Sequence, residues 1–196
     1  VDTLGGLNKL TIVNPLRLEI ETQFIEADQL QPIHARLARQ FGNKGITVYN
    51  NTPLLGRIND TPDAIHRLAY ACREAGIEFH HLYVAGLPVQ DRWNPDNPVA
   101  LYDVVDIATR VRREGSGREV PRYIIRTVLG EVDFGLSSTI VGEGDCLSVK
   151  LLPYDLAYFK ALSEDFHWPE NVSEDGEGRP VVSVNGLKKT TGFAFS

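Results

Sequence analysis

The sequence is poor in cysteine, with only Cys72 and Cys146 in 196 residues. An iron–sulfur cluster is held by three or four thiolates, so this chain alone lacks the ligands for one. The two cysteines are far apart, and Cys72 falls on the apolar side of a predicted helix, which favours a buried free thiol. No metal site is predicted, because the histidines are scattered and the adjacent pair His80 and His81 is expected to point to opposite faces of a strand.

The chain also lacks an excess of positive charge and any long apolar run. Its formal net charge of −6 argues against nucleic acid as the main partner, because phosphates are bound by clustered lysines and arginines. No stretch approaches the roughly 20 apolar residues of a membrane span, and the N-terminus has no secretory pattern. We therefore expect a soluble, cytoplasmic protein that binds a small molecule. The sequence leaves the oligomeric state open, a homo-oligomer included.

A strand–helix–strand unit can be read directly between Gly45 and Gln90. Thr61 is a predicted N-cap, Pro62 occupies the first helical position and Gly76 ends the helix. Apolar residues recur between them at the helical spacing i, i+3, i+4 and i+7. The helix has the length that a crossover between parallel strands needs.

The first strand of this unit, Ile46–Tyr49, is predicted to stop at the turn Asn50-Asn51-Thr52-Pro53, because short polar side chains and proline favour turns. The second strand is Ile77–Ala85. Such a turn follows the C-terminal end of a parallel strand, which is where α/β folds place their ligands.

Further strands are predicted over Leu16–Ile25 and Pro121–Val128, with helices beginning near Asp28 and at Asn97-Pro98. The resulting order βαβαβαβ indicates a parallel sheet covered by helices. Leu16–Ile25 alternates apolar and polar residues. Its polar face would meet water in an exposed sheet or line a ligand-filled interior in a barrel, and both alternatives remain open.

Four strands do not close a β/α barrel, which has eight strands and commonly takes about 250 residues. The chain is either an open sheet or a fragment whose first strands precede Val1, and we favour the fragment because the sequence contains no methionine. We expect residues 1–130 to be the C-terminal part of a partial parallel (β/α) barrel. Glycine-punctuated β runs predict a β-rich C-terminal extension over residues 131–196. They are Ser137–Val141, Leu147–Leu152 and Val181–Asn185, with a short helix near Asp155–Glu164.

Three segments, LRLEIETQFIEADQL, NNTPLLGRIND and FHHLYVAGL, resemble in this order the lysine 2,3-aminomutase family of radical S-adenosylmethionine (SAM) enzymes. The likeness covers about Pro15 to Gly135. Family members move an amino group by radical chemistry in a partial or full β/α barrel that holds a 4Fe-4S cluster, SAM and usually pyridoxal phosphate (PLP).

The resemblance implies the C-terminal portion of an aminomutase-like radical SAM isomerase that acts on an amino acid or related small molecule. The cluster cysteines, CxxxCxxC in the family, would lie outside this chain. The alternative is a non-catalytic α/β ligand-binding or scaffold protein derived from that family, since several family residues are replaced here.

The resemblance places part of the SAM site at Asn50, Asn51 and Glu26. The family has Gln at the position of Asn51, and Asn keeps the amide donor and acceptor on a shorter side chain. It has His at the position of Glu26, and a carboxylate there can accept from a ribose hydroxyl but cannot donate as an imidazole does. From the residues alone, Asn50–Thr52 is equally well an Asx-type turn.

Tyr83 matches a tyrosine near PLP in the family, whereas the residues alone favour an aromatic packed beside a strand. Gly86 and Arg126 stand where the family has two carboxylates that receive the distal ammonium of lysine. Losing a carboxylate and gaining a guanidinium argues against lysine as the substrate. Arg126 and Asp133 are the predicted substrate-binding residues, and no catalytic residue is assigned.

The sequence argues against PLP, because no lysine occurs between Lys44 and Lys150. The family lysine that forms the Schiff base with PLP corresponds approximately to Asp133, and a Schiff base requires an amine. Only a distant Lys150 reaching into the site would restore this chemistry.

Overall fold

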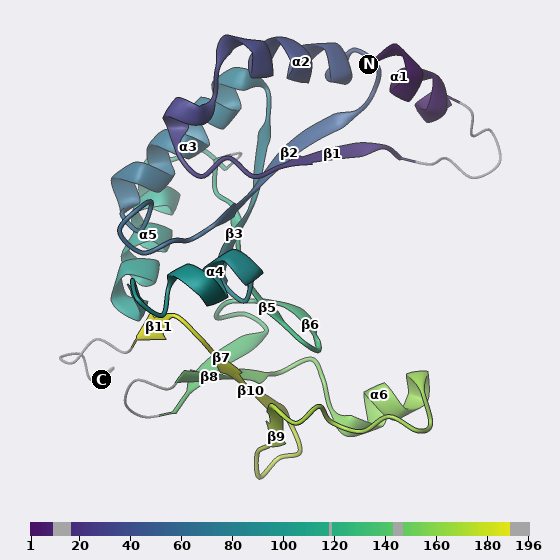
Figure 1. The fold of residues 1–196 in the computed structure, drawn as a ribbon, viewed down its shortest axis with the longest axis vertical. Helices are drawn as coiled ribbons and strands as arrows, with labels where there is room; N and C mark the ends of the chain where they lie inside the picture. The colour runs from purple at the N-terminus through teal and green to yellow at the C-terminus, as the bar shows by residue number, and fades with distance from the viewer. Residues whose placement is uncertain (10–16, 118, 143–146, 189–196) are drawn as a thin grey trace. The chain divides into compact units, whose positions relative to one another are not determined.

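The computed structural model describes residues 1–9, 17–117, 119–142 and 147–188, and this part is a mixed α/β structure (Figure 1). The elements are α1 (Asp2–Lys9), β1 (Glu19–Thr22), η1 (Ala27–Gln29), α2 (Pro32–Gly42), β2 (Thr47–Pro53), α3 (Pro62–Ala75), β3 (Glu78–Ala85), α4 (Pro88–Trp93), β4 (Val99–Ala100), α5 (Leu101–Glu114), β5 (Arg122–Thr127), β6 (Gly130–Asp133), β7 (Ser138–Val141), β8 (Leu147–Leu151), α6 (Leu156–Leu162), β9 (Val172–Glu174), β10 (Pro180–Val184) and β11 (Leu187–Lys188). The predicted order of alternating strands and helices up to β5 is confirmed.

The strands form three groups. Five strands pair in the order β1-β2-β3-β5-β6, four in the order β7-β8-β10-β9, and β11 pairs with β4. β1 and β2 are parallel, whereas β5 and β6 form an antiparallel hairpin. None of the described helices is long and apolar enough to cross a membrane.

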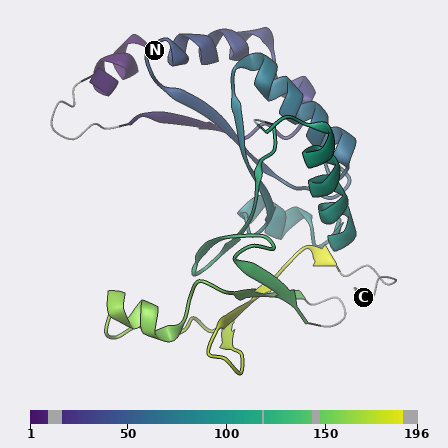
Figure 2. The ribbon, with the colours of Figure 1, turned by 180° about the vertical axis from the view of Figure 1, so that it is seen from behind.

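The chain divides into two compact units. The first unit comprises Val1–Thr52, Asn59–Leu82 and Asp106–Arg122, and the second comprises Pro53–Ile58, Tyr83–Val105 and Tyr123–Ser196. Within the first unit, α2 and α3 contact each other and lie on the same side of β1 and β2 in both views (Figures 1 and 2). This arrangement gives these two strands one helix-covered face.

Helix α3 follows its predicted capping. The Thr61 hydroxyl accepts a hydrogen bond from the Ala64 N–H at 3.2 Å, and Gly76 ends the helix with φ of 74°. The apolar face is buried along its whole length; its members are Ile65, Leu68, Ala69, Cys72 and Ala75. Local signals were sufficient here because the cap, the helix-ending glycine and the apolar spacing agree.

The prediction of a turn at residues 50–53 is wrong, because β2 continues through Pro53. Asn50 and Thr52 are fully buried, and Asn50 pairs with Thr22 of β1. Neighbouring strands and buried hydrogen bonds therefore override the local turn preference of these residues. Pro53, which has no N–H to donate, is the last residue of the strand.

Two helix starts also differ from the sequence prediction. Asp28 lies within η1, and α2 begins at Pro32. Helix α5 begins at Leu101, because the preceding Val99–Ala100 pairs with β11. Leu16, where the first strand was predicted to begin, lies outside the described residues, and β1 spans only Glu19–Thr22.

The β-rich C-terminal extension is confirmed as an antiparallel sheet. β8 pairs with both β7 and β10, and β9 pairs with the other side of β10. The predicted short helix is α6, whose N-cap Asp155 accepts a hydrogen bond from the Tyr158 N–H at 2.8 Å. α6 extends from this sheet in both views (Figures 1 and 2).

Cys72 should be unreactive in the folded protein. Its side chain is fully buried, and burial raises the pKa of the thiol to about 12. In a Cys146→Ser variant, which leaves Cys72 as the single thiol, reaction with a disulfide reagent at pH 8 should be at least about a hundredfold slower than after unfolding, because the thiolate is the reactive form. Equal rates in folded and unfolded protein would contradict the burial of Cys72. Cys146 lies outside the described residues.

Candidate functional site

Asn50 is the centre of a buried hydrogen-bond cluster in the first unit. Its Oδ1 accepts from the Thr22 hydroxyl at 2.8 Å and the Phe24 N–H at 2.7 Å. Its Nδ2 donates to the Phe24 carbonyl at 3.0 Å and to the Thr52 hydroxyl at 2.7 Å. A side-chain amide offers two donors and two acceptor positions, so this amide is fully used. Asn50 thereby fixes the path of the chain after β1 and keeps no free hydrogen-bonding group for a ligand.

Asn51 differs from its neighbour in having an unused oxygen. The residue is 4% exposed, and its Oδ1 is buried without a hydrogen-bond donor among the residues that the structure describes. Successive residues of a strand point to opposite faces, so Asn51 and Asn50 lie on different sides of β2. A buried acceptor without a partner is costly. Of the two amides, only that of Asn51 keeps an acceptor without a partner among the described residues.

Glu26 lies on the segment that Asn50 holds. It is exposed and precedes η1, where the Gln29 Oε1 accepts from the N–H groups of Ile25 at 2.7 Å and Glu26 at 3.3 Å. The Asn59 amide donates to the Ile25 carbonyl at 3.2 Å. Glu26 is thus two residues from Phe24, the backbone partner of Asn50, on a segment fixed by three amide side chains.

A polar face of the first unit carries carboxylates beside a tyrosine and histidines. Partial burial, followed by the charges of Glu21 and Glu19, raises the pKa of Tyr49. Glu21 stands opposite Tyr49 across β1 and β2, and the Tyr49 ring lies edge-on to His80 with centroids 5.2 Å apart. The polar side of β1 therefore continues across β2 to β3.

The expectation that His80 and His81 point to opposite faces is wrong. Their rings stack with centroids 3.8 Å apart and 20° between their planes. Rings on opposite faces of a strand cannot stack, so the alternation of β3 is interrupted at this pair. Among the described residues, no group of three or more His, Cys, Asp or Glu side chains is placed to hold a metal ion.

In the second unit, three predicted site residues lie on neighbouring strands. Tyr83 of β3 is 6% exposed and packs with Leu87 and Ile124. On the β5–β6 hairpin, Arg126 stands opposite Glu131 and Ile124 stands opposite Asp133.

Directly opposed residues share a face, so Arg126, Glu131 and Asp133 project from the same side of the hairpin. We call Tyr83, Arg126, Glu131 and Asp133 the charged face. The Tyr83 hydroxyl donates to the Glu131 carboxylate at 2.9 Å. Sequence reasoning missed Glu131, although a hairpin with Val128-Leu129 as its two-residue turn places it opposite Arg126.

Position 86 requires a glycine because the backbone of β5 lies very close to it. Its φ is 97°, and a Cβ built on it would lie 1.8 Å from the carbonyl oxygen of Arg126. No side chain fits between these two backbones. A carboxylate at this position, which the motif resemblance would lead one to expect, is therefore incompatible with this backbone.

Two buried side-chain amides, those of Gln90 and Asn94, form hydrogen bonds with the backbone of Leu54–Gly56, the LLG part of the segment NNTPLLGRIND. The Gln90 amide donates to the carbonyls of Leu54 at 3.0 Å and Tyr83 at 2.8 Å, and accepts from the Leu87 N–H at 3.0 Å. The Asn94 amide donates to the Leu54 carbonyl at 3.0 Å and accepts from the Gly56 N–H at 3.2 Å. Sequence reasoning missed both, although two amides spaced i and i+4, one on a short helix and one at its C-cap, were a usable signal.

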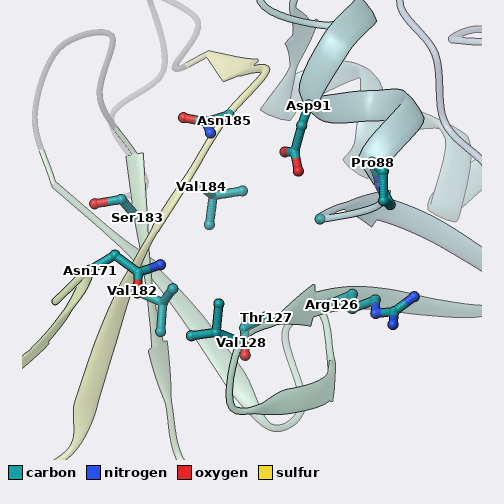
Figure 3. A pocket seen from close by; sticks show the side chains of 11 residues that line it. Pro88, Asp91, Arg126, Thr127, Val128, Asn171, Val182, Ser183, Val184 and Asn185 are labelled. Carbon is teal, nitrogen blue, oxygen red and sulfur yellow. The ribbon is translucent and has the colours of Figure 1, made fainter. Parts of the chain in front are cut away.

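A cavity of about 460 Å³ lies in the second unit, beyond Gly86 and the last residue of β5, Thr127. Pro88 and Asp91 of α4 line it together with residues of β10. Figure 3 shows the Asp91 carboxylate pointing into the cavity and the Arg126 guanidinium pointing away from it. Gly86 directly follows the last residue of β3, so the cavity lies just beyond the ends of β3 and β5.

Lys150 does not have the properties of a PLP lysine. It lies on β8, where its ammonium is 2.6 Å from the Asp175 carboxylate and 2.7 Å from that of Glu177. These hydrogen bonds raise the pKa of Lys150. Schiff-base formation needs an unprotonated amine, so the shift is opposite to what PLP chemistry requires.

Comparison with protein-family models and with curated proteins finds no match to this sequence.

Replacing Asn50 should destabilise the protein far more than replacing Asn51. Asn50→Ala leaves several buried groups unsatisfied, at about 1–3 kcal/mol each, so the free energy of unfolding should fall by about 2 kcal/mol or more. Asn51→Ala removes an oxygen that already lacks a partner and should cost less. Urea unfolding followed by circular dichroism measures both variants, and equal losses would contradict the hydrogen-bond assignment.

Gly86→Ala should destabilise more than Gly76→Ala, which serves as the matched control. Both glycines have positive φ, which costs a non-glycine residue about 1–2 kcal/mol, but a Cβ at Gly76 meets nothing within 4 Å. Gly86→Ala adds the collision with the Arg126 carbonyl. Urea unfolding of the two variants measures the difference in the free energy of unfolding. Equal losses would show that β5 moves away from a Cβ at position 86 without destabilising the protein.

Proposed function

We propose that this chain is the C-terminal portion of a cytoplasmic, aminomutase-like radical SAM enzyme that acts on an amino acid or related small molecule. The observation that carries the proposal is the charged face. Tyr83, Arg126 and Asp133 are the positions that the motif resemblance assigns to the PLP and substrate side, and they come from three neighbouring strands. Motif matching compares sequence segments only, so the closeness of these residues in the fold is independent support for the resemblance.

The charged face suits a zwitterionic substrate. The Arg126 guanidinium is exposed and can bind a carboxylate with two parallel hydrogen bonds. Glu131 and Asp133 lie on the same side of the hairpin and can accept hydrogen bonds from an ammonium group. The distal ammonium of lysine would approach Arg126 at the position where the family has a carboxylate, so a substrate without that second cation is favoured.

The first unit supplies candidate groups for SAM, which provides the initiating radical when the cluster reduces it. Asn51 offers its unused buried oxygen to a donor such as an amine or hydroxyl. Glu26 is an exposed acceptor for a ribose hydroxyl. Asn50 would act indirectly, because its amide fixes the segment from Thr22 to Phe24 through four hydrogen bonds.

Neither the cluster nor PLP is expected to be bound covalently by the described residues. Burial makes Cys72 a poor ligand by raising the pKa of its thiol to about 12, so the cluster thiolates would come from outside this chain. Lys150 is held as an ammonium by two carboxylates. The proposed enzyme therefore works without an internal aldimine between PLP and this lysine.

A non-catalytic ligand-binding or scaffold protein is the second candidate. It is favoured by Asn50 and Tyr83, whose polar groups already bond to other residues of the chain. In this alternative the inherited motifs serve folding alone. The two candidates differ in whether a full-length protein assembles a cluster and cleaves SAM.

Full-length protein reconstituted with iron and sulfide under anaerobic conditions provides the test. We expect three clustered upstream cysteines, absorbance near 400 nm and cleavage of SAM on reduction.

Asn51→Ala should weaken SAM binding by about twofold to a hundredfold, the equivalent of about 0.5–3 kcal/mol for lost hydrogen bonds. Asn43→Ala, which changes an exposed asparagine at the end of α2, is the control and should bind SAM normally. A full-length protein that assembles no cluster would support the scaffold alternative.

A further inference from the structure

The cavity beyond Gly86 is separate from the charged face. Its lining includes Arg126, but the guanidinium of that residue points away from it (Figure 3). The residues that follow along the strand, Thr127 and Val128, line the cavity as well. With a volume of about 460 Å³, the cavity lies within the range of small-molecule sites, about 300–1,000 Å³.

The cavity combines one charge with an apolar wall. In Figure 3 the Asp91 carboxylate points into it from α4, and the side chains of Val128 and Val184 point into it from below and from β10. Pro88 adds further apolar surface. Val128 is 60% exposed, so a large part of an aliphatic side chain meets solvent at this wall.

Asp91 is free to bind a ligand. Within residues 1–9, 17–117, 119–142 and 147–188, no side chain forms a hydrogen bond or an ion pair with its carboxylate. Asn171, at the edge of the cavity, adds an uncharged amide (Figure 3). The cavity thus offers an unpaired anion, neutral polar groups and valine side chains.

We propose that this cavity binds a small organic monocation, an ammonium or guanidinium group joined to a compact aliphatic body. The cationic head pairs with Asp91, and the aliphatic body covers Val128 and Val184. Asp91 is the one carboxylate among the lining residues, and no group of three His, Cys, Asp or Glu side chains in the described part of the chain is placed to hold a metal ion, so a metal would have to rely on neutral amide and hydroxyl oxygens. An anion would face the Asp91 charge, and the chain's formal net charge of −6 adds to that repulsion.

The proposal extends beyond the proposed enzyme activity and does not depend on it. The site needs neither SAM nor a cluster, because all of its groups belong to the second unit of this chain. It is therefore testable with this chain alone, and its failure would leave the radical SAM proposal untouched.

Calorimetric titration with 3-methylbutylammonium tests the proposal, with 3-methylbutanol and 4-methylpentanoate as neutral and anionic analogues. We expect saturable binding of the cation at one site, at least tenfold tighter than either analogue. Asp91→Asn should weaken it at least tenfold. Asp96→Asn, which changes another exposed carboxylate just after α4, should change the affinity less than twofold.

A second variant tests the apolar wall without altering charge. Val128→Ser should weaken binding of 3-methylbutylammonium by threefold or more while leaving binding of methylammonium unchanged, because methylammonium lacks the aliphatic body. Circular dichroism confirms that each variant is folded. Unchanged affinity in Asp91→Asn, equal binding of the carboxylate analogue, or no saturable binding at all would overturn the proposal.

Discussion

The structure depends on the need to satisfy polar groups that are buried inside strands and at strand ends. A strand that carries Asn50 into a fully buried position must give its amide four partners, and the chain after β1 is placed to do so. In the second unit the same need applies to the backbone. The Leu54 and Tyr83 carbonyls receive their hydrogen bonds from Gln90 and Asn94 of the α4 region. Segments that look like polar loops in the sequence are therefore among the most constrained parts of the molecule.

The sequence predicted the elements whose signals are local and missed those that depend on distant partners. Helix α3 was predictable because its cap, its apolar spacing and its terminal glycine lie within one segment. The continuation of β2 through Asn50 was not, because the groups that stabilise it lie 26 to 28 residues away. The stacking of His80 on His81 was missed for a related reason, since regular alternation was assumed along β3. Motif resemblance nominated Tyr83, Arg126 and Asp133 as candidates, but Glu131 joins them only once the hairpin pairs it with Arg126.

In the second unit, the direction in which a charged side chain points depends on its position along the strand or helix that carries it. Alternation along β5 sends the Arg126 guanidinium away from the cavity that the following residues line. A cation and an unpaired carboxylate, Asp91, are thereby kept in different surroundings within one unit. Lys150 is placed elsewhere again, on β8, where Asp175 and Glu177 neutralise it. The three charged groups are thus kept in three different surroundings within the second unit.

The contact between Gly86 and the Arg126 carbonyl has a consequence for how such a protein can evolve. A glycine at this position permits the β5 backbone to come close, and the close backbone then forbids any larger residue. A carboxylate at position 86 can thus be accommodated only after β5 has moved outward, and a single substitution cannot achieve both steps. Substitution at position 86 and displacement of β5 are thus coupled, and sequences that keep this backbone are expected to keep the glycine.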